Sequence, residues 1–191
     1  MKKILVFLCT VSLFFGVVSL AEATPLTFNS VDGWWHRVQA EGKITLDGLD
    51  TFSYCVERSQ HISIGGTYNA SIREIGSNYL TAAQLMATFA PSLHGAYGTY
   101  SKIETGAALQ LAIWSSLGLY VSDIINTDIW GLANHMKDHA TAGISGISWA
   151  DLGDNQDLLV AKSTHTPAPA TMLLFGSGLI GLVVVGRKKF Q

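Results

Sequence analysis

Apolar and polar residues alternate in short runs through the first part of the chain, as they do in β-strands with one buried face. Glycine or aspartate bounds these runs, which marks the turns between strands. We expect strands at residues 34–38, 43–46, 51–56 and 61–64, with a turn at residues 65–66.

From Asn78 onward the apolar residues recur at helical spacing instead. One helix is expected over residues 79–89, where Pro91 stops it, and another over residues 127–140. Residues 143–162 return to short apolar runs and are expected to form one or two strands. The whole pattern predicts an α+β fold with a β-rich first part and a helical insertion.

The clearest helix is expected over residues 104–117, between the helices at residues 79–89 and 127–140. Ser101 and Glu104 have the spacing of a capping box at its start, and Gly118 stands where it ends. Gln110 projects from a face of this helix that is otherwise small or apolar. The residues three and four positions away are Gly106, Ala107, Ile113 and Trp114.

A buried amide such as that of Gln110 needs hydrogen-bond partners, because leaving it unpaired costs about 1–3 kcal/mol. Gly106, one turn earlier, would let another backbone approach the helix closely. Ordinary hydrogen bonds to a neighbouring loop are one way to satisfy the amide. Gln84, on the preceding helix, has no such surroundings.

Both ends of the chain are strongly apolar. Two lysines precede an uncharged run at the N-terminus, and small residues follow at Ala21 and Ala23. This pattern predicts a secretory signal peptide at residues 1–23 that signal peptidase removes after Ala23. An uncleaved anchor helix is the alternative. At the C-terminus, the apolar run 171–186 ends in three basic residues, which predicts a transmembrane helix whose C-terminus stays in the cytoplasm.

The C-terminal segment begins with Thr166-Pro167-Ala168-Pro169-Ala170, ahead of the glycine-interrupted apolar run and its Arg-Lys-Lys end. Residues 167–191 resemble a PEP-CTERM sorting signal, in which Pro167 and Pro169 match the two prolines and Ala168 replaces the usual glutamate. The resemblance implies a Gram-negative bacterium that makes exopolysaccharide. It also implies export, transient anchoring in the inner membrane, cleavage by an exosortase-type enzyme, and release to the cell surface or biofilm matrix.

Residues 24–166 remain as the working domain and carry seven basic and thirteen acidic residues. This acidity argues against partners that are recognised by negative charge, such as nucleic acid or anionic lipid. The whole chain is 48% hydrophobic and 14% charged, which excludes disorder for most of its length. The domain is long enough to bury one hydrophobic core.

Cys55 is the lone cysteine of this domain, because Cys9 leaves with the signal peptide. An internal disulfide is therefore excluded. Two interpretations of Cys55 stay open at this point: a buried residue that acts as a small hydrophobe, and a reactive or cross-linking group.

Cys55 and Gln110 each lie in a short motif. Tyr-Cys-Val-Glu at residues 54–57 is followed by Leu-Gln-Leu-Ala-Ile-Trp at residues 109–114, and the pair resembles the thioester domains of bacterial surface adhesins. The resemblance spans about residues 50–142 and implies a β-sandwich or barrel with a helical lobe. It also implies an internal thioester between the Cys55 sulfur and the Gln110 acyl carbon.

The resemblance further implies that an amine on a surface partner opens this thioester and leaves the protein attached through Gln110. The reaction happens once, so the domain is not expected to be an enzyme, and no cofactor is implied. Glu57 is the first candidate for proton transfer, since a regular strand would place it on the face of Cys55, ahead of His61 and His94. The candidates for shielding the bond from water are Tyr54 and Trp114.

A non-covalent exopolysaccharide-binding or structural matrix protein without a thioester is the alternative function. Aromatic side chains could then stack on sugar rings, although core packing is the competing interpretation for them. They are Trp34, Trp35, Tyr97 and Tyr100. A hydrolase ranks third. His135 and His139 have zinc-site spacing, but no glutamate follows His135. Cys55 with a histidine could form a nucleophilic dyad, but no further motif supports it. No metal site is expected.

Overall fold

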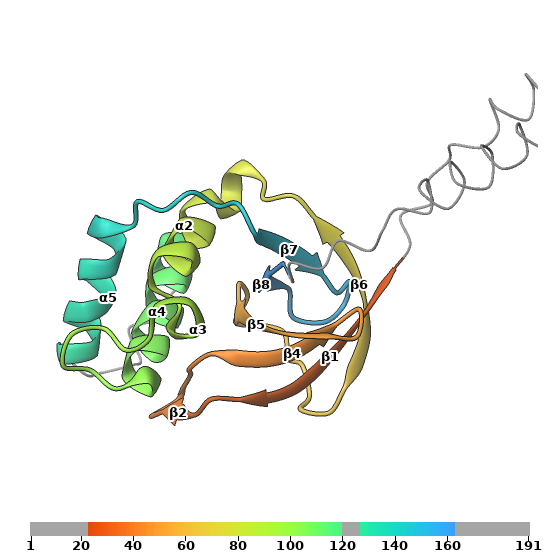
Figure 1. The fold of residues 1–191 in the computed structure, drawn as a ribbon, viewed down its shortest axis with the longest axis horizontal. Coiled ribbons are helices and arrows are strands. Elements are labelled where there is room, and N and C mark those ends of the chain that lie inside the picture. Colours follow the sequence, from red (N-terminus) through yellow and green to blue (C-terminus); the bar gives the residue numbers. More distant parts are fainter. Residues whose placement is uncertain (1–22, 120–126, 163–191) are drawn as a thin grey trace, which may run out of the picture.

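The computed structural model describes residues 23–119 and 127–162, which form a closed β-barrel with a helical lobe beside it (Figure 1). The barrel strands pair antiparallel in the order β1-β4-β5-β8-β7-β6. They are β1 (Thr24–Val31), β4 (Gly42–Leu46), β5 (Leu49–Cys55), β6 (Thr67–Arg73), β7 (Ile147–Asp151) and β8 (Leu158–Ala161). The expected α+β class is confirmed, and the β part is a barrel.

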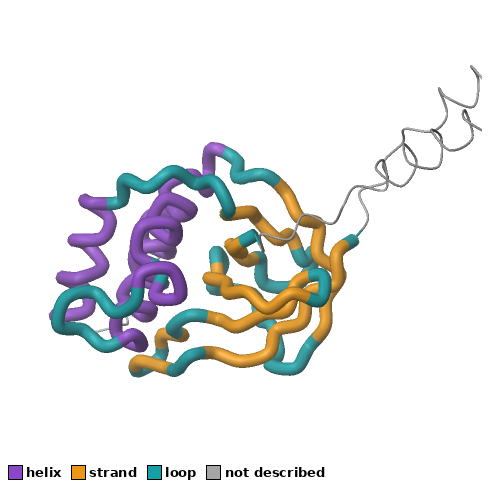
Figure 2. The backbone as a smooth tube through the Cα atoms, in the orientation of Figure 1, coloured by secondary structure: helices purple, strands orange, loops and turns teal. Residues whose placement is uncertain are grey.

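The helices follow one another between β6 and β7, so the lobe is an insertion in the barrel, as the sequence predicts. They are η1 (Ser77–Tyr79), α2 (Leu80–Phe89), α3 (Pro91–His94), α4 (Lys102–Ser116) and α5 (Thr127–His139). Figure 2 shows the helices gathered on one side of the molecule and the strands on the other. The two expected C-terminal strands are present as β7 and β8.

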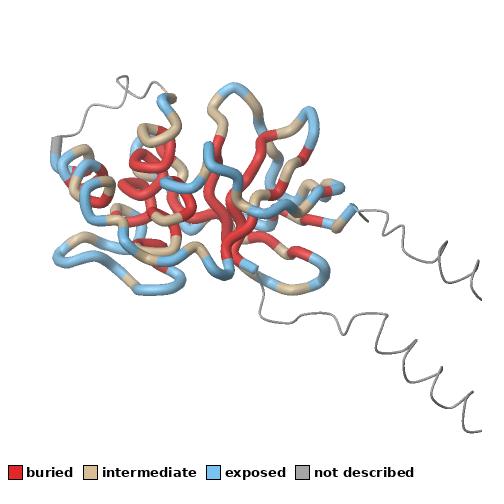
Figure 3. The backbone as a smooth tube through the Cα atoms, turned by 90° about the horizontal axis from the view of Figure 1, so that it is seen from above, coloured by how far each residue is buried: buried red, intermediate tan, exposed pale blue. Residues whose placement is uncertain are grey.

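The core lies where the lobe meets the barrel. Helix α4 is buried from Thr105 to Trp114 and packs against α2, α5 and the strand β5 (Figure 3). On the barrel side, apolar residues alternate along β1 and β4 and meet across the pair, with Phe28 opposite Ile44 and Leu26 opposite Leu46. A helix buried on all sides is typical of a lobe centre rather than a surface helix.

Two of the expected strands are wrong. The run 34–38 is broken into β2 (Trp34–Trp35) and β3 (Val38–Gln39), because the backbone turns at His36 with φ 52°. The run 61–64 belongs to no strand, since it leads into the turn at Gly65 (φ 81°) and leaves Ile64 exposed. Strands β1 and β6 were not expected.

The helix bounds agree with the sequence, except around Pro91. Pro91 does not only end the preceding helix but also opens α3 at its first position, where a missing N–H costs nothing. Within residues 23–119 and 127–162, no helix is long and apolar enough to cross a membrane. The expected signal peptide, transmembrane helix and sorting residues Pro167 and Pro169 lie outside these ranges.

Candidate functional site

The side-chain amide of Gln110 is bonded to the backbone of Cys55 at both of its ends. The Cys55 N–H donates to Gln110 Oε1 at 2.9 Å, and Gln110 Nε2 donates to the Cys55 carbonyl oxygen at 2.7 Å. Cys55 ends β5 and Gln110 lies within α4, so this pair joins the barrel to the helical lobe (Figure 1). The two residues that the sequence pairs are therefore brought together, and both are buried.

Helix α4 lies close to β5 because its sequence fixes where the helix begins and lets the backbone of the barrel segment at residues 40–41 approach it. The capping box is present: Ser101 Oγ accepts from the Glu104 N–H, and the Glu104 carboxylate accepts from the Ser101 N–H. A Cβ on Gly106 would lie 3.2 Å from the Ala40 Cβ and 3.3 Å from the Glu41 nitrogen. The close backbone approach expected at Gly106 is thus confirmed.

The Cys55 thiol is free and lies in an apolar environment. Burial disfavours the thiolate and raises the pKa of Cys55 from 9.0 to about 12. A thiol with this pKa stays protonated at neutral pH, and the burial of Cys55 shields it from water and from oxidants. The same shielding would protect a reactive acyl bond at this position.

Hydrogen bonding polarises the Gln110 amide. A backbone donor directed at the oxygen can stabilise the negative charge that develops there when a nucleophile attacks the carbon. The Cys55 N–H is directed at Gln110 Oε1, at 2.9 Å in the uncharged amide. The two hydrogen bonds also satisfy a buried amide that would otherwise destabilise the fold.

Tyr54 packs away from the Cys55–Gln110 pair. Its hydroxyl donates to Glu41 Oε2 at 3.3 Å, and strand alternation puts its ring on the face of β5 opposite to Cys55. Burial, followed by the charge of Glu41, raises the pKa of Tyr54 well above its usual value. Tyr54 therefore anchors the other face of the strand.

Trp114 stands one helical turn beyond Gln110 on the same face of α4, where the sequence expects a shield. Its ring is buried, and the Arg58 guanidinium lies over it at 5.3 Å from the ring centroid.

Glu57, the first candidate for proton transfer, lies outside the strand that carries Cys55. The expected strand at residues 51–56 ends at Cys55, so Glu57 lies beyond it. The Glu57 carboxylate accepts a 3.4 Å hydrogen bond from the Asp157 N–H.

His61 and His94 are both exposed, and the His94 ring contacts the Ala87 carbonyl at 2.8 Å. The rings of His135 and His139 stack at 4.0 Å, and the Tyr97 hydroxyl bonds His135 Nε2 at 2.7 Å. Among the described residues, no group of three or more histidine, cysteine, aspartate or glutamate side chains could hold a metal ion.

A buried carboxylate that the sequence analysis missed ties the barrel to α3. Glu41 accepts hydrogen bonds from the Ser92 hydroxyl, the Ser92 N–H at 3.2 Å and Lys43 Nζ at 3.1 Å. Lys43 also pairs with Asp32 at 3.0 Å. Glu41 and Ser92 are 51 positions apart, so no local pattern could reveal the contact.

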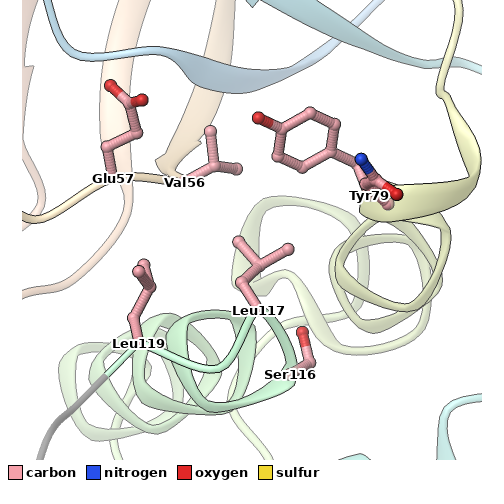
Figure 4. Close-up of a pocket in the computed structure, with 7 residues that line it drawn as sticks. Val56, Glu57, Tyr79, Ser116, Leu117 and Leu119 are labelled. Carbon is pink, nitrogen blue, oxygen red and sulfur yellow. The ribbon is translucent and has the colours of Figure 1, made fainter.

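A pocket opens between the end of β5, the start of α2 and the end of α4 (Figure 4). Its volume is about 480 Å³, and its lining combines leucine and valine side chains with polar groups. The lining residues are Val56, Glu57, Asn78, Tyr79, Ser116, Leu117 and Leu119. In Figure 4, the Tyr79 ring points its hydroxyl toward Val56 and Glu57.

Comparison with known proteins identifies the C-terminal segment. Residues 165–189 match the family model of the PEP-CTERM protein-sorting motif. The chain carries a PEP-CTERM sorting signal. Such a signal implies export, processing by an exosortase-type enzyme and sorting to the cell surface. The match is present although Ala168 stands where glutamate is usual.

The described domain is similar in fold to two solved structures from Streptococcus pyogenes. One is the N-terminal thioester domain of the fibronectin-binding protein SfbI, with 12% identity, a TM-score of 0.50, and 78% of this chain and 97% of that chain covered. The other is the N-terminal domain of the pilus tip adhesin Cpa, with 12% identity, a TM-score of 0.53, and 77% and 97% covered.

The fold is therefore that of the adhesin thioester domains, as the sequence motifs imply. At this identity the likeness concerns the fold alone. No curated protein sequence matches the chain significantly.

Proposed function

We propose that this exported protein attaches covalently to an amine-bearing partner through a thioester between Cys55 and Gln110. The observation that carries the proposal is the two-sided hydrogen bonding of the Gln110 amide to the Cys55 backbone, at 2.9 and 2.7 Å. These bonds hold the carboxamide in one orientation against the residue that carries the buried thiol, and a fixed orientation is one requirement of a near-attack geometry.

Formation of the bond is a condensation. The Cys55 sulfur adds to the Gln110 amide carbon, the Cys55 N–H stabilises the oxygen, and the thiol proton goes to the departing nitrogen, which leaves as ammonia. A primary amine later adds to the same carbon and displaces the sulfur. One amine proton goes to the sulfur, so the products are a substituted Gln110 amide and the Cys55 thiol.

The site serves one capture event for each molecule, so we propose an adhesive protein and not an enzyme. We propose that the capture takes place at the surface or in the extracellular matrix of a Gram-negative cell, after transient residence in the inner membrane. The PEP-CTERM sorting signal supports this location. The partner then carries a surface amine, and nucleic acid is not proposed as a ligand.

The intact mass of the purified full-length protein tests the proposal, once its termini have been determined. We expect a mass short by one ammonia, and addition of one methylamine after treatment with that amine. Cys55→Ser should have the mass calculated from its sequence, with no loss of ammonia and no methylamine adduct. Gln84→Glu, a change at a glutamine outside the site, should lose ammonia and add methylamine as the unaltered protein does. Full mass together with a titratable Cys55 thiol would overturn the proposal.

The alternative function is non-covalent binding of extracellular polysaccharide. Trp34 favours it, since this side chain on β2 is 58% exposed, whereas Trp35 and Tyr100 pack partly against the core. An exposed aromatic ring can stack on a sugar face. Loss of glycan binding in Trp34→Ala, combined with the full mass, would select this function.

A further inference from the structure

Three side chains that can bind a metal ion meet on the helical lobe. His135 and His139 lie one turn apart on α5, and their rings stack with centroids 4.0 Å apart. The Tyr97 hydroxyl lies 2.7 Å from His135 Nε2. Figure 1 shows α5 on the side of the lobe that is farthest from the barrel. The cluster therefore lies on the outer side of the lobe, whereas Gln110 faces the barrel.

The hydrogen bonding of His139 is that of a metal ligand. Its Nδ1 lies 2.8 Å from the His135 carbonyl oxygen, which can only accept, so Nδ1 carries the proton. In the neutral imidazole the lone pair is then on Nε2, and the side chain is exposed. Histidines that bind metal ions almost always donate their other ring N–H to a carbonyl or carboxylate group in this way.

Tyr97 is held beside His135 from two directions. Its backbone N–H donates to Thr105 Oγ1 at 3.0 Å, and its ring meets that of Phe89 edge to face at 5.6 Å. Thr105 and Phe89 are both buried, so these contacts fix the loop that carries Tyr97. The 2.7 Å between the phenol oxygen and His135 Nε2 is close to the spacing of about 3 Å between neighbouring ligands of an ion bound at about 2.1 Å.

We propose that Tyr97, His135 and His139 form a binding site for a divalent transition-metal ion, with copper(II) as the ion bound most tightly. Imidazole nitrogen suits copper and zinc, and among the divalent first-row metals copper(II) has the highest affinity for a given set of donors. The Tyr97 hydroxyl proton passes to solvent, and the phenolate oxygen and His135 Nε2 bind the ion side by side. The His139 ring is exposed, so it can turn about its side-chain bonds until Nε2 reaches the same ion.

This inference goes beyond the proposed function, because it needs no thioester and no amine. The sequence alone does not predict the site, since a catalytic zinc site with this histidine spacing needs a glutamate after His135. A site that only binds the ion has no such requirement. Its third donor, Tyr97, is 38 positions away from His135 and reaches it only in the folded chain.

The experiment titrates the full-length protein, freed of metal by dialysis against a chelator, with copper(II) chloride. Calorimetry measures the affinity, and visible absorption detects the charge-transfer band of a phenolate bound to copper(II), which we expect in the unaltered protein. Tyr97→Phe keeps the ring against Phe89 but removes the oxygen, so it should abolish the band and weaken binding about tenfold or more. The matched control Tyr100→Phe changes a tyrosine three positions away that packs partly against the core, and it should alter neither measurement.

The histidines have a control of their own. His139→Asn should weaken copper(II) binding about tenfold or more, whereas His94→Asn, at an exposed histidine whose ring contacts the Ala87 carbonyl, should leave it unchanged. Unchanged affinity in either Tyr97→Phe or His139→Asn, or a band that persists in Tyr97→Phe, overturns the proposal. Cys55→Ser should bind copper(II) as the unaltered protein does, and loss of binding there would place the ion at the thiol and overturn this site. The absence of an ammonia deficit in the unaltered protein would overturn the thioester alone.

Discussion

Cys55 differs from an ordinary cysteine in that its surroundings suppress ionisation. The residue is buried, and its pKa of about 12 lies three units above the 9.0 of an exposed thiol. Alkylating reagents react with the thiolate, so the native fold withholds the reactive form at physiological pH.

We predict that any form of the protein that carries Cys55 as a thiol, such as the methylamine-opened form, reacts slowly with iodoacetamide. At pH 8 the native protein should react at least about a hundredfold more slowly than the same protein in urea, given the thiolate fraction at a pKa of about 12. The rate should keep rising toward pH 12. A plateau near pH 9 would show that the thiol is exposed.

The raised pKa of Cys55 also makes the stability of the folded state depend on pH. Because the pKa of Cys55 is raised on folding, the folded state keeps its proton between pH 9 and 12, where the unfolded state loses it. The stability contributed by the neutral thiol is therefore complete below pH 9 and is lost as the pH rises toward 12.

Glu41 shows that the two parts of the molecule also meet at a polar contact on the other face of β5. Its carboxylate accepts hydrogen bonds from the Tyr54 hydroxyl, Lys43 Nζ and Ser92. A buried carboxylate with this many donors is compensated, whereas the same group without them would be strongly destabilising. Cys55 and Tyr54 thus hold adjacent positions of one strand against different parts of the lobe.

Helix α4 depends on Gly106 for its distance from the barrel. The approach of the Ala40 and Glu41 backbone within 3.4 Å of a Cβ at this position is tighter than ordinary packing. Gly131 in α5 is the opposite case, since nothing lies within 4 Å of a Cβ there. The two glycines form a matched pair in the same lobe.

We predict opposite results for alanine at these two positions. Gly131→Ala should raise the free energy of unfolding by about 0.5–1 kcal/mol, because alanine is the better helix former. Gly106→Ala should give no such gain and should lower the free energy of unfolding, since the added methyl group pushes α4 away from Ala40. Urea unfolding of both variants measures this, and a gain at Gly106 equal to that at Gly131 would contradict the close-packing argument.

How far the elements could be predicted depended on whether burial or strand pairing stabilises them. The helices α2 and α5 bury one apolar face, so their period marks them in the sequence. Helix α4 is buried all round from Thr105 to Trp114, and its capping box marks its start. Strand β6 buries only Ala70, and it is held by pairing with β1 and β7, which no local pattern shows. Strand β1 contains Pro25, which has no N–H to donate to a strand pair, and it begins directly after the expected signal peptide.

Residues 61–64 show the opposite error, because their sequence has a strand pattern but the chain there forms no strand. His61, Ile62, Ser63 and Ile64 alternate as a strand does, but the segment has no ladder partner. At the site, two motifs were enough to pair Cys55 with Gln110. Their hydrogen-bonding pattern and the Glu41 contact depend on elements that meet only in the folded chain.

For the whole molecule, the proposed thioester is a cross-link as well as a reactive group. Cys55 and Gln110 are 55 positions apart and belong to the barrel and the lobe. A covalent bond between them would close a loop that includes β6, α2 and α3. In the chain-entropy model, closing a loop of this length stabilises the folded state by about 4 kcal/mol.

We therefore predict that capture of an amine weakens the protein that performs it. Methylamine should lower the midpoint of thermal unfolding by roughly 10 °C, since about 4 kcal/mol is lost in a domain of this size. Cys55→Ser, which keeps the packing but never forms the bond, should unfold near the temperature of the methylamine-treated protein and should not respond to methylamine. Calorimetry of the four samples measures this. Equal midpoints before and after methylamine opens the thioester would show that hydrogen bonds and packing alone join the barrel to the lobe. The expected fall in the midpoint would mean that the adhesive bond to the partner forms at the expense of the protein's own internal bond.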